Sequence, residues 1–566
     1  MTSPSDSPPT SEVEVEASPP EGRSGRGLAP RVFYPSAVLV FVFVLAAAVF
    51  PEAMNSGLEK ANEVVVNSIG WYYVLLTVCF VGFSLWLAIS DYGHITLGND
   101  GEKPEFGYMS WFAMLFSAGM GIGLMFWGVA EPLYHFAGPP PGTGGGSDAD
   151  MANAAMGRTF LHWGLHAWAI YIIVGLGVAY AVHRKKLPVS IRWALKPILG
   201  DRVEGWIGDV IDVVAIVGTL FGVATSLGFG VAQVGAGISF LGLTEDGSGA
   251  WLQVGLIAAI TGVATLSVMS GIGKGIKWLS NINLVLAGLL LLFVLTVGPT
   301  QFLLNDMVQS LGYYLQNFFS MSFSTFAYQE EGPSWLGSWT TYYWGWWISW
   351  SPFVGIFIAR ISRGRTVREF ITGVLLVPTL LTSLWFVIMG GTALHREIVG
   401  DGGIIGADGS VSENEALFQM LDGLPGGAFL PGLAIIMIVI FFVTSSDSGS
   451  YVVDMIANGG DPNPPVWSRV MWAVLEGAIA AVLIVAGAAS GVEGGGLASL
   501  QTMAIITAVP FSVVMIGICI SLVKAFIAED KEQERVKRKV LARELALEAE
   551  EMQAAVPGEG TGRSSG

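Results

Sequence analysis

The stretch that decides the fold is Trp339 to Arg368, with the sequence WTTYYWGWWISWSPFVGIFIARISRGRTVR. Its first part is apolar and as long as a membrane span, and its end is basic. After Trp339 it carries four further tryptophans and four arginines, namely Trp344, Trp346, Trp347, Trp350, Arg360, Arg363, Arg365 and Arg368. Gly345 and the Ser351-Pro352 pair predict a break in this helix, because proline lacks an N–H group. Unpaired backbone groups are tolerated inside a membrane only where they line a cavity or bind a ligand.

The composition of the chain is typical of a membrane protein. Of its 566 residues, 52% are hydrophobic and only 13% are charged, whereas about a quarter of the residues of a soluble domain are charged. The mean hydropathy is +0.59. Twelve apolar runs are centred near residues 41, 79, 118, 171, 222, 260, 290, 348, 382, 440, 480 and 514. We therefore expect an all-α integral membrane protein with twelve transmembrane helices. Its six histidines and two cysteines form no catalytic or metal-binding pattern, so we expect no enzyme.

Basic residues lie in alternate loops. The loops at 183–206, 271–279 and 360–368 are rich in lysine and arginine, whereas the intervening loops contribute only Lys60, Arg158 and Arg396. Loops with an excess of lysine and arginine face the cytoplasm. The pattern predicts a multi-pass protein of the cell (plasma) membrane with both termini in the cytoplasm.

The apolar runs also suggest how the chain is organised. We expect six segments: a disordered cytoplasmic tail at 1–31, two leading transmembrane helices at 32–92, a five-helix repeat at 108–300, an extracytoplasmic amphipathic surface helix and loop at 301–334, a second five-helix repeat at 335–526, and a partly helical cytoplasmic tail at 527–566. The last tail is either a solvated helix or a regulatory arm that docks on the Arg360–Arg368 loop or on anionic lipid.

Three alternating glycines interrupt another apolar run, in the sequence Gly119-Met120-Gly121-Ile122-Gly123. Small residues often only let membrane helices approach closely. Their alternate spacing spreads these glycines around a helix, which favours an unwound segment whose free N–H groups would bind a carboxylate. This segment and the tryptophan-rich stretch open the two expected halves. Broken segments in corresponding positions are typical of inverted-repeat transporters.

Further aromatic residues occur in the span near residue 171, where Trp168 and Tyr171 share a helix face and Trp163 lies close to it. Such a stripe is often only packing. Indole rings also attract weakly hydrated cations, so the second aromatic stretch supports a cage for a quaternary ammonium group equally well. His162 and His166 are four residues apart but lack a third ligand, so ordinary helical histidines are favoured over a metal site.

The run Phe441 to Asp447, FFVTSSD, places hydroxyl groups and a carboxylate in an apolar span. Hydroxyl and carbonyl oxygens are hard ligands that suit sodium. Alternatively, Thr444 and Ser445 bond back to carbonyls of their own helix. Asp447 is a functional candidate as an ionisable residue within the membrane, or it pairs with an arginine near the cytoplasmic end.

These motifs together resemble those of the betaine/choline/carnitine transporter (BCCT) family over roughly residues 33–526. The resemblance rests on GMGIGLMFWGVAEP at 119–132, FLHWGLHAWAIY at 160–171, WWISWSPFVGIFIARISRGRTVREF at 346–370 and FFVTSSDS at 441–448. It implies a LeuT-like fold, in which a five-plus-five inverted repeat follows two extra helices. It further implies a homotrimer in membrane lipid that imports a small quaternary-ammonium substrate with Na+, without a cofactor and without nucleic acid.

The same resemblance assigns residues to the expected sites. It places an aromatic cage on Trp163, Trp168, Tyr171 and Trp347, a path lined by Phe126 and Trp350, and a substrate carboxylate at the backbone of Gly119, Gly121 and Gly123. It places one sodium site on Ser117, Met120, Phe441, Thr444 and Ser445. Sodium-coupled members of the family have a second sodium site, of which Thr219 and Phe353 are present here.

The second sodium site departs from the family pattern at Val223, where a threonine is expected. Thr225 or Ser226 could replace that hydroxyl, so the number of coupled sodium ions stays open. Choline-preferring members tend to carry an acidic residue at the position of Gly123, so the glycine favours a zwitterion. We expect a sodium-coupled symporter that imports glycine betaine for osmoprotection. A choline, carnitine or ectoine carrier is the alternative.

Overall fold

The computed structural model describes residues 27–119, 121–270, 273–489 and 495–555. Over these residues the chain is helical and contains no β-sheet, only isolated bridges between Thr96 and Thr366 and between Ile405 and Val411. The expectation of an all-α protein is confirmed. Most of the expected N-terminal tail, residues 1–26, and the end of the C-terminal tail, residues 556–566, lie outside the described residues.

The long helices follow one another in the order of the apolar runs. They are α1 Pro30–Val49, α2 Pro51–Ile89, α3 Tyr108–Gly119, α4 Ile122–Ala137, α5 Asp148–Trp163, α6 Leu165–Ala179, α8 Trp206–Phe240, α9 Ala250–Ser270, α10 Gly273–Val297, α11 Thr300–Ser322, α13 Tyr342–Ile361, α14 Val367–Ile398, α16 Phe429–Ala457, α17 Val466–Ala488 and α18 Gly495–Ala555. Short helical elements connect them: η1 Asp91–His94, η2 Tyr180–Arg184, η3 Ile191–Leu195, α7 Lys196–Leu199, η4 Gly200–Glu204, α12 Gly332–Leu336, η5 Gly337–Thr341 and α15 Ala416–Asp422.

Ten of the described helical segments are long and apolar enough to cross a membrane. The two further expected centres, near residues 118 and 348, fall on the interrupted pair α3–α4 and on α13, which are not among those ten. A multi-pass membrane protein is therefore supported. The total of twelve spans and the division into two five-helix repeats stay predictions.

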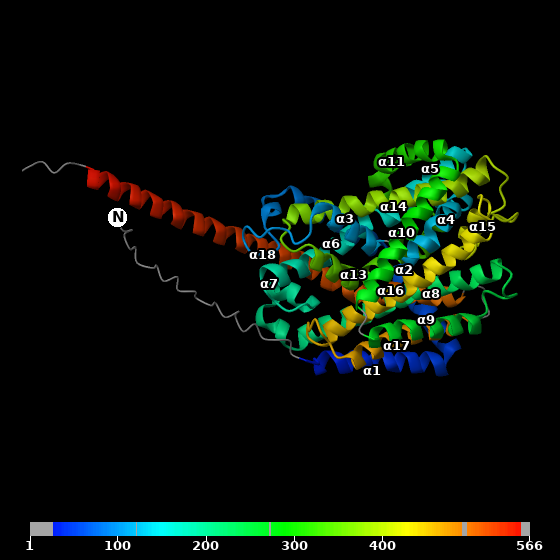
Figure 1. Ribbon diagram of the computed structural model, residues 1–566, viewed down its shortest axis with the longest axis horizontal. Coiled ribbons are helices and arrows are strands. Elements are labelled where there is room, and N and C mark those ends of the chain that lie inside the picture. Colours follow the sequence, from blue (N-terminus) through cyan, green and yellow to red (C-terminus); the bar gives the residue numbers. More distant parts are fainter. Residues whose placement is uncertain (1–26, 120, 271–272, 490–494, 556–566) are drawn as a thin grey trace, which may run out of the picture.

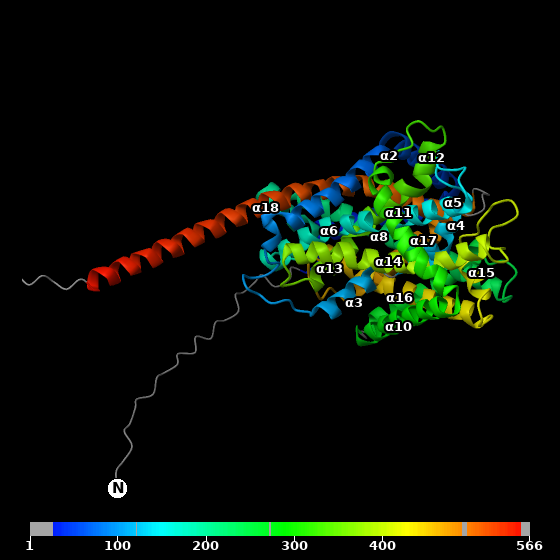
Figure 2. The ribbon, with the colours of Figure 1, turned by 90° about the horizontal axis from the view of Figure 1, so that it is seen from above.

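The helices pack side by side in one body, with α1 at one edge and α11 at the opposite edge (Figure 1). The α5–α6 segment is the most buried of the candidate spans, since 89% of the most apolar window of 148–184 is buried, against 28% for α1. The end of α18 projects far beyond the body in both views (Figures 1 and 2). The burial of α5 and α6 places their aromatic residues away from lipid.

The expected break in the tryptophan-rich helix is wrong, because α13 runs without interruption through Gly345 and Pro352. Pro352 cannot donate to the carbonyl of Ile348, and the hydroxyl of Ser351 donates to that carbonyl instead, at 2.7 Å. Gly345 serves close packing, since a Cβ there would lie 2.8 Å from the Cα of Ile505 on α18. The helix therefore keeps its course because a neighbouring hydroxyl satisfies the carbonyl that proline leaves free.

A break occurs instead in the central span, where Gly164 separates α5 from α6. Its backbone is non-helical, with φ −98° and ψ −130°. A Cβ at this position would lie 2.4 Å from the carbonyl oxygen of Phe160, so the conformation depends on glycine. The interruption directly follows Trp163, the first residue of the expected cage.

The expected surface helix is α11, which packs against α5 and α14. Leu303, Ser310 and Tyr314 face the body, whereas Val308 and Phe319 are exposed. Its apolar residues therefore occur on both faces. The exposed side is one that lipid or another protein surface could cover.

Candidate functional site

The glycine segment at 119–123 interrupts a helix, as its spacing indicated. Helix α3 ends at Gly119 and α4 begins at Ile122, and between them Gly121 is extended, with φ −154° and ψ −170°. Met120 lies outside the described residues, so its expected role as a sodium ligand has no structural description. Gly123 lies against two rings, since a Cβ there would be 2.8 Å from Trp346 and 2.9 Å from Trp163.

The four residues of the expected cage lie together in the interior. The rings of Trp163 and Trp347 are 4.9 Å apart at 70°, those of Tyr171 and Trp347 are 6.2 Å apart at 72°, and those of Trp168 and Tyr171 are 5.4 Å apart at 79°. All four side chains are buried. The interlocked rings come from α5, α6 and α13, so the helix break at Gly164 and the packing of α13 on α6 create the cluster.

The break at Gly164 also anchors the cage. A helix end leaves carbonyl groups without partners, and two of those at the end of α5 accept side-chain donors. The indole N–H of Trp347 donates to the carbonyl of His162 at 2.9 Å, and the hydroxyl of Thr382 donates to the carbonyl of Trp163 at 3.3 Å. The position of the Trp347 ring therefore depends on the interruption of its neighbouring helix.

A cavity of about 430 Å³ lies beside the cage. Trp350, whose ring is 6.3 Å from that of Trp347, connects the two. Among the residues that line the cavity are Ser117, Gly121, Phe353, Phe441, Thr444 and Ser445, so one space collects residues of both expected sodium sites and of the glycine segment. It also contains Asn281 and Asn283 of α10, which the sequence reasoning missed because no motif marks them. Phe126 lies elsewhere, packed on Phe229 at 4.7 Å.

A second cavity, of about 360 Å³, continues from the first. The two share Phe353, Phe357, Asp447 and Ser448, and the second is also lined by His183, Arg360 and Arg469. Its outer part thus reaches the basic residues that the sequence assigns to the cytoplasmic side. The path leads from Trp350 toward that side of the molecule.

The hydroxyls expected to bind sodium also bond to their own helices. Thr444 donates to the carbonyl of Ile440 at 2.9 Å, and Thr219 to that of Ala215 at 2.7 Å. Thr225 donates to the carbonyl of Leu500 at 3.0 Å as well as to its own helix. Its hydroxyl therefore has other partners and does not replace the hydroxyl that Val223 lacks. Thr444 still lines the main cavity, where its oxygen can accept an ion while the hydroxyl donates backwards.

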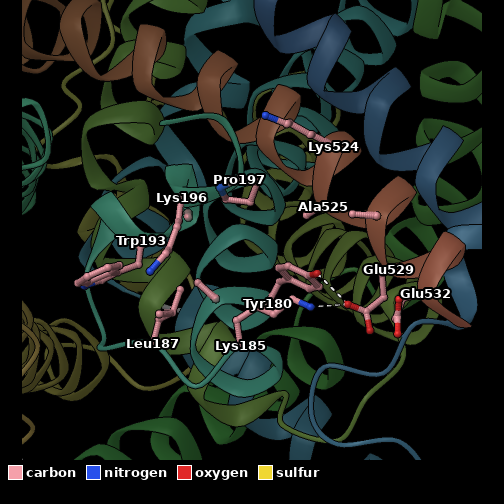
Figure 3. Close-up of a pocket in the computed structure, with 13 residues that line it drawn as sticks. Tyr180, Lys185, Leu187, Trp193, Lys196, Pro197, Lys524, Ala525, Glu529 and Glu532 are labelled. Carbon is pink, nitrogen blue, oxygen red and sulfur yellow. Dashed lines mark hydrogen bonds and ion pairs between the residues drawn. The ribbon is translucent and has the colours of Figure 1, made fainter. Parts of the chain in front are cut away.

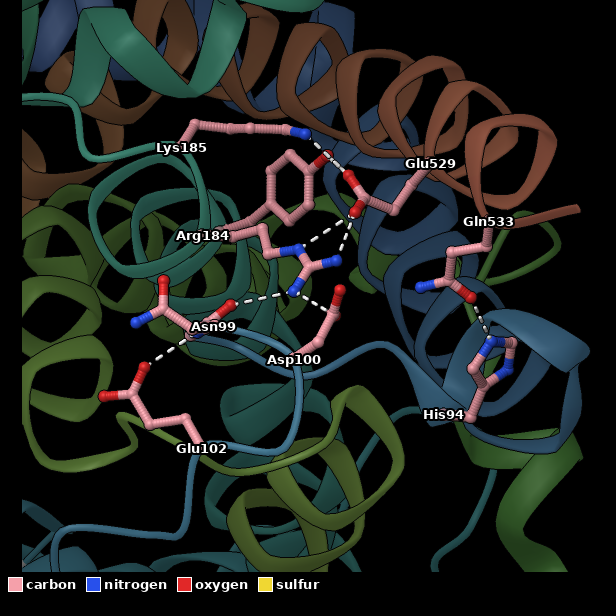
Figure 4. Close-up of polar contacts among 10 residues, drawn as sticks. His94, Asn99, Asp100, Glu102, Arg184, Lys185, Glu529 and Gln533 are labelled. Carbon is pink, nitrogen blue, oxygen red and sulfur yellow. Dashed lines mark hydrogen bonds and ion pairs between the residues drawn. The ribbon is translucent and has the colours of Figure 1, made fainter. Parts of the chain in front are cut away.

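The basic 183–206 loop, together with the segment that follows α2, holds the base of the projecting α18. Arg184 donates to Glu529 at 2.9 Å and to Asp100 at 2.5 Å, Lys185 donates to Glu529 at 2.5 Å, and Gln533 contacts His94 at 3.2 Å (Figure 4). A nearby pocket of about 540 Å³ lies between α18 and the 180–197 segment (Figure 3). It contains none of the residues expected at the substrate or sodium sites.

This arrangement differs from the expected docking of the tail on the Arg360–Arg368 loop. The arginines of that loop have other partners. Arg363 donates to Glu102 at 2.6 Å, and Arg368 donates to the carbonyl of Ala88 at 2.7 Å. The backbone N–H of Asn99, together with Arg363, holds the pKa of Glu102 below its usual value. The loop is therefore tied to the segment after α2, and α18 is tied to η2.

Comparisons with known proteins agree on one family. Residues 31–531 match the model of the BCCT family, described as betaine/carnitine/choline family transporter. An uncharacterized transporter of Mycobacterium tuberculosis is 52% identical over 88% of this chain and 83% of its own length. The glycine betaine transporter OpuD of Bacillus subtilis is 44% identical over 90% and 96%. The osmo-independent choline transporter BetT1 of Acinetobacter baylyi is 40% identical over 89% and 94%.

Proposed function

This chain belongs to the betaine/carnitine/choline transporter family, and we propose that it is a sodium-coupled symporter that imports glycine betaine. The observation that carries the proposal is the interlocked set of Trp163, Trp168, Tyr171 and Trp347 beside a cavity lined by hydroxyl oxygens. A trimethylammonium group is a cation too weakly hydrated to need hydrogen bonds, and aromatic faces are the protein groups that bind it best.

In the proposed bound state, the ammonium group enters between the rings and the carboxylate lies toward the glycine segment. In the structure the rings touch one another, so binding requires them to separate. Trp347 contacts Trp163, Tyr171 and Trp350, and its movement would connect the cage with the cavity. Gly121, which lines that cavity, interrupts α3–α4 and offers backbone N–H groups of the kind that bind carboxylates at broken helices.

Sodium would bind on the other side of the same cavity. Ser117 on α3 and Thr444 and Ser445 on α16 line it from opposite helices. An ion between them would link α3 to α16 next to the substrate, which is how an ion can stabilise one conformation of a transporter. An ion that binds one conformation more tightly than the other couples the sodium gradient to the movement of the substrate. The cavity toward the basic side would then be the release path.

A zwitterionic substrate is favoured over a bare cation by two observations. Gly123, which lies against Trp346 and Trp163, supplies no carboxylate to neutralise a bare cation, and OpuD of B. subtilis, a named glycine betaine transporter, covers most of the chain at 44% identity. The choline transporter BetT1 of A. baylyi, at 40% identity, keeps choline as the second candidate.

Uptake into proteoliposomes tests the proposal. Labelled glycine betaine is supplied with an inward sodium gradient, and unlabelled betaine, choline, carnitine and ectoine are added as competitors. Betaine should compete most strongly, and replacing sodium by potassium should stop uptake. Strong inhibition by choline with weak inhibition by betaine would establish the second candidate. Uptake that is equal in sodium and in potassium would refute sodium coupling.

A further inference from the structure

The carboxylate of Glu131 is fully buried behind the cage and accepts hydrogen bonds on both oxygens. The indole N–H of Trp163 donates to Oε2 at 2.6 Å, and the hydroxyl of Tyr343 donates to the same oxygen. On the other oxygen, Oε1, Nδ1 of His162 lies at 2.7 Å and Nε2 of His135 at 3.3 Å. Four groups from three helices thus converge on one carboxylate.

Two of these four groups belong to the substrate end of the site. Trp163 is a cage residue, and the Tyr343 ring lies 5.6 Å from Trp163 and 5.8 Å from Trp347. An indole N–H can only donate a hydrogen bond, so the orientation of Trp163 requires an acceptor at this position. The carboxylate therefore fixes the ring that faces Trp347, although Glu131 itself has no contact with the cavity.

The cluster is better explained as a hydrogen-bond network than as a metal site. Ligand atoms of Glu131, His135 and His162 all lie within 4.8 Å of one another. Both oxygens of Glu131, however, are already used, each by two partners, and Nε2 of His162 lies 3.1 Å from the hydroxyl of Thr340. At 2.7 Å, Oε1 and Nδ1 of His162 are at hydrogen-bonding distance. A metal ion would have to displace these contacts.

A carboxylate at this position also affects how strongly the Trp163 ring attracts a cation. Donation of the indole N–H to an anion increases the electron density of the ring, whose face attracts cations through that density. Charges interact more strongly in the interior than in water. A negative group one ring away from the ammonium pocket would therefore favour positive headgroups over neutral groups of the same shape.

We propose that Glu131 is the positioning residue of the cage and the group that selects a positively charged headgroup. This inference rests on the proposed function, since it assigns the ring cluster to an ammonium group. Glu131 acts through Trp163 and Tyr343 and does not touch the substrate.

The test compares glycine betaine with tert-butylacetate, in which carbon replaces the ammonium nitrogen and the shape is retained. Both compete with labelled betaine for uptake by proteoliposomes that contain the full chain. In Glu131→Gln the inhibition constant for betaine should rise about tenfold, and that for tert-butylacetate should change less than about twofold. The discrimination between charged and neutral headgroups should therefore fall.

Glu476→Gln is the matched control, because Glu476 is also fully buried, in α17, and accepts a hydrogen bond from Ser446 at 3.2 Å. This variant should leave the ratio of the two constants unchanged. Trp163→Phe retains a ring without the N–H donor. It should also reduce the discrimination between betaine and tert-butylacetate, even if Glu131→Gln does not fold. An equal loss for both compounds, or an unchanged ratio in a folded Glu131→Gln variant, would overturn the proposal, as would an unchanged ratio in Trp163→Phe. Wild-type protein that does not take up betaine would refute the proposed function instead.

Discussion

Among the four residues of the expected cage, Trp347 has the most ring contacts. Its ring contacts Trp163, Tyr171 and Trp350, and its N–H is bound to the carbonyl of His162. Trp168 contacts Tyr171 but has no ring contact with Trp347 among those of the described residues. The loss of Trp347 should therefore disturb the cage more than the loss of Trp168.

We predict that Trp347→Leu raises the apparent Km for betaine about tenfold or more, since each desolvated cation–π contact contributes about 0.5–2 kcal/mol. Trp163→Leu and Trp168→Leu should have smaller effects, because the remaining rings still enclose the ammonium group. Initial rates of labelled betaine uptake measure this. Trp251→Leu, at a position 81% exposed on the outside of the body, is the control. An unchanged Km in Trp347→Leu would contradict the assignment of the cage.

Gly123 offers a test of substrate charge. An aspartate there adds an anion near the place expected for the substrate carboxylate, so Gly123→Asp should raise the preference for choline relative to betaine. Its Cβ would lie 2.8 Å from Trp346, so we also expect slower transport. Gly123→Ala, which has the same Cβ without the charge, is the control. Competition by choline and betaine should differ between the two variants, and equal ratios would refute the charge argument.

At the scale of elements, α13 depends on Ser351 for its continuity through Pro352. Ser351→Ala would leave the buried carbonyl of Ile348 without its side-chain donor, which costs about 1–3 kcal/mol. We predict a lower thermal midpoint of the purified protein and slower uptake, since α13 carries Trp347. Thr392→Ala is the control, because its hydroxyl donates at 2.5 Å to the carbonyl of Ile388 in α14, and residue 392, unlike a proline, keeps a backbone N–H for that carbonyl. Equal midpoints for the two variants would mean that Ser351 does not support the helix.

Element boundaries show where sequence reasoning reached its limit. The centres of the apolar spans and the break at Gly121 follow from hydropathy and glycine spacing alone. The break at Gly164 does not, because WGLH contains a single glycine of a kind that most membrane helices tolerate. The continuity of α13 was equally hidden, since it depends on the hydroxyl of Ser351 in a particular rotamer. Both outcomes are decided by contacts within a few ångströms.

The same limit applies to Glu131, which the sequence analysis quoted within a motif without giving it a role. Three of its four partners lie 31 to 212 residues away in the chain, among them His162 and Tyr343. The aromatic cage, in contrast, could be anticipated, because tryptophans are rare and their clustering in two spans is visible in the sequence. Long-range polar partners leave no such pattern in a single sequence.

The base of α18 is the element that could connect the tail to transport. Its attachment through Glu529 to Arg184, at the end of the central α6–η2 segment, links the tail to the helix that carries Trp168 and Tyr171. We predict that removal of residues 530–566, which keeps Glu529 but removes the part of the tail that this contact anchors, alters the dependence of uptake on osmolality and leaves the isosmotic Km unchanged. Removal of 545–566 alone, which keeps the contact of Gln533 with His94, is the control. An identical osmotic response after the longer deletion would show that the tail is inert.

At the scale of the whole molecule, the proposed coupling to sodium rests on the residues that line the cavity. Thr444 and Ser445 line it, whereas Val223 lacks the hydroxyl of a second site and Thr225 is bonded to Leu500. We therefore predict uptake with a Hill coefficient for sodium nearer one than two. Thr444→Ala combined with Ser445→Ala should abolish stimulation by sodium, and Val223→Thr should raise the coefficient. A wild-type coefficient near two would mean that other ligands form the second site.

The central claim is that sodium drives a trimethylammonium zwitterion through this molecule, and concentrative uptake measures it most directly. One sodium ion that moves inward gains about 2.3 kcal/mol per 100 mV, which corresponds to roughly fifty-fold accumulation of a neutral zwitterion at 1.36 kcal/mol per decade. Proteoliposomes with a sodium gradient and an inside-negative potential should therefore accumulate labelled glycine betaine well above the external concentration, and lose it when a sodium ionophore is added. Betaine that only equilibrates across the membrane, with no response to the ionophore, would contradict the account.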